Sequence, residues 1–370
     1  MIVEWPRLRK IARQDLGFAW SDASLRFFGV LHPLTMLAAA AVMLLLAGCG
    51  SGTTGNRATS TAVVIVSGLA STTPFTTTGA GCATGLAAGG TATALRAHLL
   101  GKGDAVYTAP AAAGRGQVHD QIGSGAFGIC PTTPPETMTI DTTGSIDLAG
   151  EHLARFLDWL RTDKGVQEVD LVGHSMGGGA TPYLAQQAAA RGWGSEALWL
   201  FQLAPVFTTR VGSGPIKVPG HTRVVVETYD NDFIVDARSG IQQYRDYAIP
   251  SSQKKYVMVR TDDHGGPAAT LLATHTSPNS LLAPEDAIRF YGIYRVGDAL
   301  ESCALWGKNC DADLTYMGKW SDGREVRRSI SSANPVDAGP PAIIFSLFGI
   351  ALECESSFNP RAHTCPPSRP

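Results

Sequence analysis

The segment VQEVDLVGHSMGGG at residues 166–179 constrains the fold more than any other part of the chain. An apolar run typical of a buried strand ends there at Ser175, and Gly173 and Gly177 lie two residues to either side of it. A serine after a buried strand is usually the cap of the next helix. Here the flanking glycines indicate a tighter, strained turn that brings the strand and the helix close together. Such a turn would lift the serine hydroxyl clear of the sheet.

Strands and helices alternate on the N-terminal side of this turn. Residues 61–68, TAVVIVSG, form a β-branched run typical of a strand buried on both faces. Residues 89–103 are expected to form a helix that ends at glycine, and residues 104–110 a second strand. Apolar residues recur every three or four positions in 144–165, which predicts a helix directly before the serine segment. The alternation predicts an α/β fold with a mostly parallel central sheet and helices on both faces.

The motif GHSMGG at residues 173–178 resembles the α/β-hydrolase family, and within it the lipase and esterase branch. The resemblance extends over about residues 61–300. It implies that Ser175 is a nucleophile and that an acid and then a histidine follow it along the chain.

Two aspartates are candidates for the acid. The expected strand RVVVETY is followed by Asp230 and Asp232. In the family an acid stands shortly before an apolar Ile-Val pair, and this register favours Asp232, with Asp230 as the alternative. The acid would accept a hydrogen bond from the histidine and stabilise its charged form. The other aspartate is expected to be a turn residue.

Two histidines are candidates for the base. His264 directly follows the expected strand 255–261, where the family has its histidine loop, and it is the favoured base. His275 is the alternative, and it is expected within or after a helix over 268–274. His174 is expected to pack beneath the turn, with its side chain pointing away from the serine hydroxyl.

The resemblance also implies two backbone donors for an oxyanion. The N–H of Met176 would be one, and the N–H of Leu69 the other, with Ala70 as the alternative.

Pro182 falls in the second turn of the helix after Ser175. We therefore expect that helix either to kink or to restart with Thr181 as its cap.

The N-terminus carries the pattern of an export signal. Basic residues precede an apolar run at 37–48, which is shorter than the roughly 18 residues expected of a spanning helix. Leu46-Ala47-Gly48-Cys49 resembles the bacterial lipobox, which implies a lipid on Cys49 that attaches the exported protein to the cell envelope. The alternative is an uncleaved short anchor. The expected order is a signal peptide at 1–48, a polar tether at 49–60, a catalytic domain at 61–300 and a disulfide-containing extension at 301–370.

The cysteines are consistent with export. Six cysteines remain besides Cys49, and an even set in an exported chain suggests disulfides. Short spacing favours two pairs and leaves a third: Cys303–Cys310, Cys354–Cys365 and Cys82–Cys130. A zinc site is the rival interpretation, but the chain has no CxxC pair. The net charge of −2 gives no electrostatic reason to expect a nucleic-acid partner.

These observations together predict a carboxylic ester hydrolase, an esterase or lipase that uses Ser175, His264 and Asp232 and forms an acyl-enzyme. This chemistry needs no metal or organic cofactor. An acyltransferase with the same residues is one alternative. A non-catalytic lipoprotein that keeps the fold as a binding module is the other. The sequence does not indicate the natural substrate, a lid or the oligomeric state.

Overall fold

The structure, a computed structural model, describes the strands of a central sheet and helices that pack against it. The described residues are 61–66, 98, 102, 106–109, 120–122, 136–138, 157–158, 160–162, 165–166, 168–195, 197–208, 210–278, 286–335, 352–357 and 359–367. They belong to one compact unit that contains residues 58–370.

A seven-stranded sheet organises this unit, with the strands in the order β2-β1-β5-β6-β7-β8-β9. The strands are β1 (Thr61–Val66), β2 (Val106–Ala109), β5 (Glu168–His174), β6 (Trp199–Leu203), β7 (Arg223–Tyr229), β8 (Lys254–Val259) and β9 (Ile330–Ser332). The first six pair in parallel, and β9 adds to β8 in the antiparallel sense. A separate antiparallel pair joins β3 (Asp120–Ile122) to β4 (Glu136–Met138). The central strands are apolar runs because both faces of the sheet are covered.

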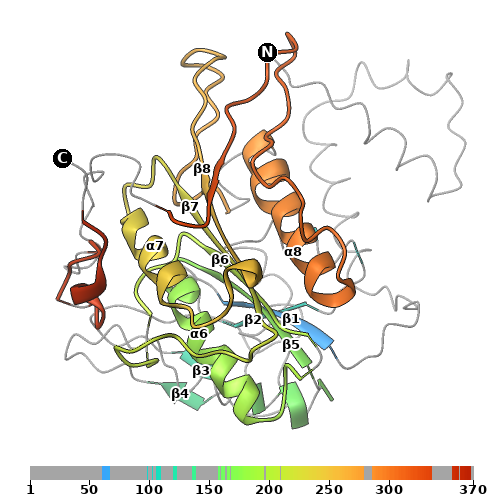
Figure 1. Ribbon diagram of the computed structural model, residues 1–370, viewed down its shortest axis with the longest axis vertical. Coiled ribbons are helices and arrows are strands. Elements are labelled where there is room, and N and C mark those ends of the chain that lie inside the picture. Colours follow the sequence, from blue (N-terminus) through green and yellow to red (C-terminus); the bar gives the residue numbers. More distant parts are fainter. Residues whose placement is uncertain are drawn as a thin grey trace, which may run out of the picture. The chain divides into compact units, whose positions relative to one another are not determined.

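Helices cover both faces of the sheet (Figure 1). On one face α6 (Met176–Ala190) packs against β5 and β6, and α7 (Ala237–Asp246) packs against β7 and β8. On the other face α8 (Arg295–Trp306) lies against β6 and β7, directly after a π-helical turn over Ile288–Tyr294. Short 3₁₀ turns occur at Ser251–Gln253 and Ala362–Thr364. The predicted fold class is confirmed: this is the α/β-hydrolase fold.

Helix α6 runs through Pro182 without restarting, which rules out one of the two expected alternatives, a new helix capped by Thr181. Proline has no N–H to donate to the carbonyl of Gly178, four residues earlier. That carbonyl instead accepts the hydroxyl of Thr181 at 2.8 Å and the side-chain amide of Gln202 at 2.6 Å. The acceptor is therefore satisfied, and the helix continues.

The residues beyond 300 are part of the same body, because α8 spans that position and β9 belongs to the central sheet. Two predicted disulfides are confirmed, Cys303–Cys310 and Cys354–Cys365. Disulfides are typical of oxidising environments. Cys49, Cys82 and Cys130 lie outside the described residues. Within the described ranges, no helix is long and apolar enough to cross a membrane.

Candidate active site

Ser175 occupies a strained turn between β5 and α6. Its φ of 58° and ψ of −125° lie in a region that residues with side chains rarely adopt. Its N–H donates to the carbonyl of Leu203 at 2.9 Å, and its own carbonyl accepts the N–H of Val206 at 3.0 Å. The segment after β6 thus holds the backbone of Ser175 on both sides, which stabilises the strained conformation.

The glycines around Ser175 are required by close packing. A Cβ added at Gly173 would lie 2.4 Å from the carbonyl oxygen of Gly177, where strand and helix meet. A Cβ at Gly179 would lie 2.0 Å from the carbonyl oxygen of Phe207. The turn therefore has the geometry that the glycine spacing predicts, with the serine at its apex.

Asp232 and His275 form a buried pair at the carboxyl edge of the sheet. The Nδ1 atom of His275 lies 2.8 Å from Oδ2 of Asp232. The other carboxylate oxygen, Oδ1, accepts the N–H groups of Ile234 and Val235, both at 2.9 Å. The N–H of Asn231 donates to the carbonyl of Ala273 and joins the two loops beside the pair. Both oxygens of Asp232 are engaged, so the carboxylate has a fixed orientation toward the imidazole.

The expectation that His264 would meet Asp232 is corrected, because its alternative His275 holds that position. The chain leaves β8 and makes an excursion whose two arms pair at Asp262 and Leu271, with hydrogen bonds of 2.9 and 2.8 Å. His264 lies within this excursion, whereas His275 lies after the chain has returned. Residues 268–274 contain no helix, so the helix expected there, within or before His275, is also corrected.

His264 belongs to a different cluster, on the far side of that excursion. Its Nε2 lies 2.7 Å from Oδ2 of Asp322, its Nδ1 accepts Nη1 of Arg324 at 2.8 Å, and its ring packs edge-on against Trp320. Because a guanidinium group only donates, Nδ1 of His264 is an acceptor and Nε2 carries the proton.

Asp230, the alternative acid, bonds a different loop. Its Oδ1 accepts the N–H of Thr261 at 2.8 Å, a residue 31 positions along the chain, so this is not the local turn bond expected of one of the two aspartates; Asp232 itself makes that bond, through the N–H of Ile234. Burial raises the pKa of the Asp230 carboxyl above its usual value.

His174 connects the serine turn to the histidine loop. It directly precedes Ser175, it is buried as expected, and its ring centroid lies 4.7 Å from that of His275. Its Nε2 also lies 2.7 Å from the backbone oxygen of His275. The loop that carries His275 is therefore held directly against the residue beside Ser175. This link was not expected, because sequence does not show which side chain His174 would contact.

The backbone beside Ser175 offers free donors. Helix α6 begins at Met176, and the first N–H groups of a helix have no acceptor within it. The N–H of Met176 is one of these first groups of α6, and its role as an oxyanion donor stays a prediction. Leu69 and Ala70, the candidates for the second donor, lie outside the described residues.

Two further polar groups lie under the site on the α8 side of the sheet. His174, Leu203 and Glu227 are neighbours in register across β5, β6 and β7. Burial raises the pKa of the Glu227 carboxyl well above its ordinary value, and Tyr229 donates to Glu227 Oε1 at 2.8 Å. Burial and the nearby His275 lower the pKa of His174 well below its ordinary value. An acid within the apolar run of RVVVETY was the available sequence signal for Glu227.

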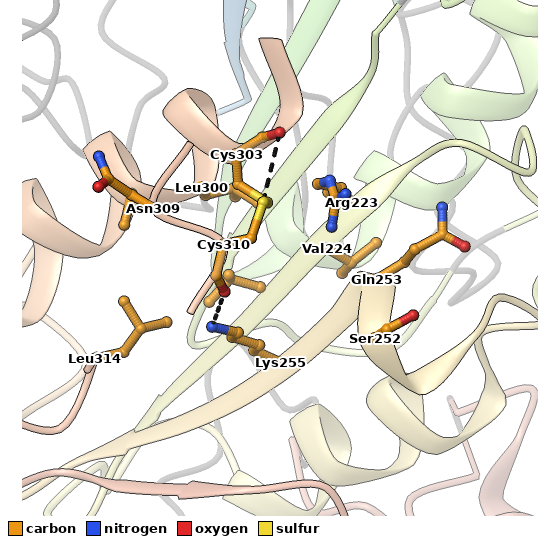
Figure 2. A pocket seen from close by; sticks show the side chains of 12 residues that line it. Arg223, Val224, Ser252, Gln253, Lys255, Leu300, Cys303, Asn309, Cys310 and Leu314 are labelled. Atoms are coloured by element: carbon orange, nitrogen blue, oxygen red, sulfur yellow. Dashed lines mark hydrogen bonds between the residues drawn. A yellow bond between two sulfur atoms is a disulfide. The ribbon is translucent and has the colours of Figure 1, made fainter. Parts of the chain in front are cut away.

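A pocket elsewhere on the sheet is separate from this site. Figure 2 shows it at the opposite ends of the strands, where Arg223 and Lys255 lie near the starts of β7 and β8 and Cys303 and Cys310 form their disulfide. The ammonium of Lys255 donates to the carbonyl of Cys310 at 2.5 Å. The described residues contain no group of three metal-ligating side chains.

Comparisons with known proteins add little. No model of a known protein family matches the chain, and no curated protein matches it. A solved structure described as a predicted CIB-like hydrolase from Thermoplasma acidophilum resembles part of it, with 14% identity and a TM-score of 0.33. That likeness covers 62% of this chain and 84% of the other. It is too low to support an argument about activity.

Proposed function

We propose that the protein is a serine hydrolase of carboxylic esters, of the esterase or lipase kind, with Ser175 as nucleophile, His275 as base and Asp232 as acid. The single observation that carries the proposal is the buried Asp232–His275 pair held against the strained serine turn. Three groups in the order serine, acid, histidine are the arrangement that activates a hydroxyl on this fold.

The roles follow from the hydrogen bonds. Asp232 engages Nδ1 of His275, which leaves Nε2 as the ring atom that can take the proton of Ser175. The hydroxyl oxygen then attacks the ester carbonyl, and the N–H of Met176 stabilises the oxyanion. One such donor is worth about 3 kcal/mol of the barrier. The alcohol leaves with the proton from His275, and water, activated by the same histidine, releases the acid from the acyl-enzyme.

The test is active-site labelling followed by turnover. We expect a fluorophosphonate to label wild-type protein at Ser175, and p-nitrophenyl esters of increasing chain length to be hydrolysed. Ser175→Ala should abolish both. Absence of labelling in folded wild-type protein would contradict the proposal and favour a non-catalytic binding module. Labelling with slow hydrolysis that an added alcohol accelerates would favour acyl transfer.

We also propose that the protein is exported and attached to the cell envelope through a lipid on Cys49. The lipobox-like LAGC segment, the basic and apolar residues before it, and the two disulfides support this location. Metabolic labelling with a fatty-acid analogue should mark the wild-type protein and not Cys49→Ser. A soluble, unlabelled wild-type protein would contradict attachment.

A further inference from the structure

The side chain of His174, the residue that precedes the nucleophile, has one hydrogen bond within the described part of the chain, and that bond is to the proposed base. Nε2 of His174 lies 2.7 Å from the backbone oxygen of His275. A carbonyl oxygen only accepts, so Nε2 carries the ring proton and donates it. The two rings are tilted by 41° with their centroids 4.7 Å apart.

The other ring nitrogen of His174 is buried and has no partner among the residues that the structure describes. Nδ1 finds no hydrogen-bond partner among the described residues, although the side chain is almost completely buried. Leaving a buried polar atom unsatisfied costs about 1–3 kcal/mol. An apolar side chain of the same size would fill this space without that cost. Packing alone therefore does not account for a histidine at this position.

The charge state of His174 suits a neighbour that becomes cationic. Burial, together with the nearby His275, lowers the pKa of His174 well below its ordinary value, so its ring stays neutral. When His275 takes the serine proton it becomes an imidazolium. A neutral neighbour does not repel that charge, whereas a second cation would.

We propose that His174 is a positioning residue for the base: its Nε2–H donates to the backbone carbonyl of His275 and fixes that loop against the serine turn. The inference rests on the proposed function, because positioning matters only if His275 acts on Ser175. The bond ties the segment that carries the nucleophile to the backbone of the loop that carries the base, and the bond between His275 Nδ1 and Asp232 holds the ring itself.

The experiment compares two variants of similar size and shape. His174→Gln keeps an N–H near the position of Nε2, and His174→Met removes the donor while it fills the space. We expect kcat for a p-nitrophenyl ester to fall about 10- to 100-fold in His174→Met with little change in KM, the range that loss of orientation produces. His174→Gln should keep most of the wild-type kcat.

A spectroscopic measurement separates positioning from folding. The Nδ1 proton of His275, bonded to Asp232, should give a low-field proton NMR signal that persists in His174→Gln and broadens or disappears in His174→Met. Thermal unfolding of both variants supplies the folding control. The inference would be overturned if the two variants had equal kcat values and equal NMR spectra. It would also be overturned if both variants lost activity equally and only in proportion to their loss of thermal stability.

The failure of the proposed function would look different. Wild-type protein that neither reacts with a fluorophosphonate nor hydrolyses esters would contradict the serine hydrolase itself. The NMR comparison would still report whether His174 orders His275. A catalytically active wild type with indifferent His174 variants would contradict this inference alone.

Discussion

His264 and His275 both follow β8, and their hydrogen-bond partners give them different roles. His275 faces a buried carboxylate that two backbone N–H groups already orient, whereas His264 lies between Asp322 and Arg324 at the protein surface. A base must keep one ring nitrogen available for the nucleophile. Both ring nitrogens of His264 are engaged by charged partners, so it is poorly suited to that role.

Replacing each histidine by alanine tests this assignment. We expect His275→Ala to lower kcat/KM for a p-nitrophenyl ester by about 10⁴-fold, because removal of the base leaves only the oxyanion donors and substrate binding. His264→Ala should stay within about 3-fold of wild type. A larger loss in His264→Ala than in His275→Ala would contradict the assignment.

Glu227 should make stability depend on pH. Burial raises the pKa of its carboxyl, so in the folded protein it stays protonated to higher pH than in the unfolded chain, where it ionises above about pH 4.5. Unfolding then releases a proton, so the free energy of unfolding declines as pH rises, by up to about 1.4 kcal/mol per pH unit from this group. Glu227→Gln cannot ionise and should remove that decline.

Urea unfolding between pH 4.5 and pH 8 measures the effect of Glu227. The difference in unfolding free energy between Glu227→Gln and wild type should shift in favour of the variant as pH rises. The Tyr229 hydroxyl can still donate to the amide oxygen of glutamine, which keeps the variant a close match. Parallel curves for the two proteins across this range would contradict the prediction.

The sequence predicted the site residues unequally, for physical reasons. Ser175 was predictable because the glycine spacing reports a local backbone constraint. Asp232 was favoured over Asp230 because, in the family that the chain resembles, the acid stands shortly before an apolar pair, here Ile234-Val235. His264 was preferred over His275 because it is nearer to β8. That reasoning failed because Asp262 pairs with Leu271, so the chain reaches Asp232 only after this pair has closed.

Among the elements, α6 shows how tightly packing restricts sequence. Its first turn passes so close to residues 205–207 that Gly178 and Gly179 have no room for a Cβ. At Gly178 the added atom would lie 2.9 Å from the Cα of Pro205. The loop after β6 in turn bonds the backbone of Ser175, so this close approach supports the nucleophile turn.

Gly179→Ala should therefore lower the free energy of unfolding, whereas an alanine at a less crowded glycine position should not. Its Cβ would meet a backbone carbonyl, which cannot move aside as a flexible side chain could, and we expect a loss of about 2–4 kcal/mol in unfolding free energy. Gly220→Ala is the matched control, because nothing lies within 4 Å of its added Cβ. Chemical denaturation compares the two. Similar stabilities would show that the helix shifts without penalty.

Elements were predictable where burial leaves a simple pattern. The runs at β1, β5, β7 and β8 are rich in β-branched residues, and this composition indicates buried parallel strands. Helix α7 was not predicted from the sequence, because its buried face carries Gln242 and Gln243 rather than an apolar stripe. Gln243 bonds the amide of Gln202 at 2.8 Å, so the polar face is satisfied by a neighbour 41 residues away. Such a partner is not visible in the local pattern.

At the scale of the whole molecule, the C-terminal segment, described at residues 352–357 and 359–367, is attached to the rest of the fold at α7. Arg238 forms ion pairs with both Asp236 and Glu355, and Arg361 pairs with Asp246 at 2.5 Å. The amide of Gln242 donates to the carbonyl of Arg361, also at 2.5 Å. Arg361 is itself buried, so removing Asp246 would leave its charge without that ion pair, whereas buried Arg238 would keep Asp236 if Glu355 were removed.

The Cys354–Cys365 disulfide closes the loop that makes these contacts, and its removal should loosen the segment from α7. A loop of this size contributes about 2–3 kcal/mol by restricting the unfolded chain. We therefore expect the Cys354→Ser, Cys365→Ser double variant to unfold roughly 5–10 °C below wild type. The first turn of α7 begins five residues after Asp232, but the acid is held by its own turn, so kcat should change by less than about 3-fold.

The Cys303→Ser, Cys310→Ser variant is the control for loss of a disulfide at the other end of the strands. An unchanged melting temperature in the first variant would mean that the charged contacts alone hold the segment, and a collapse of kcat with intact folding would mean that the acid loop depends on it.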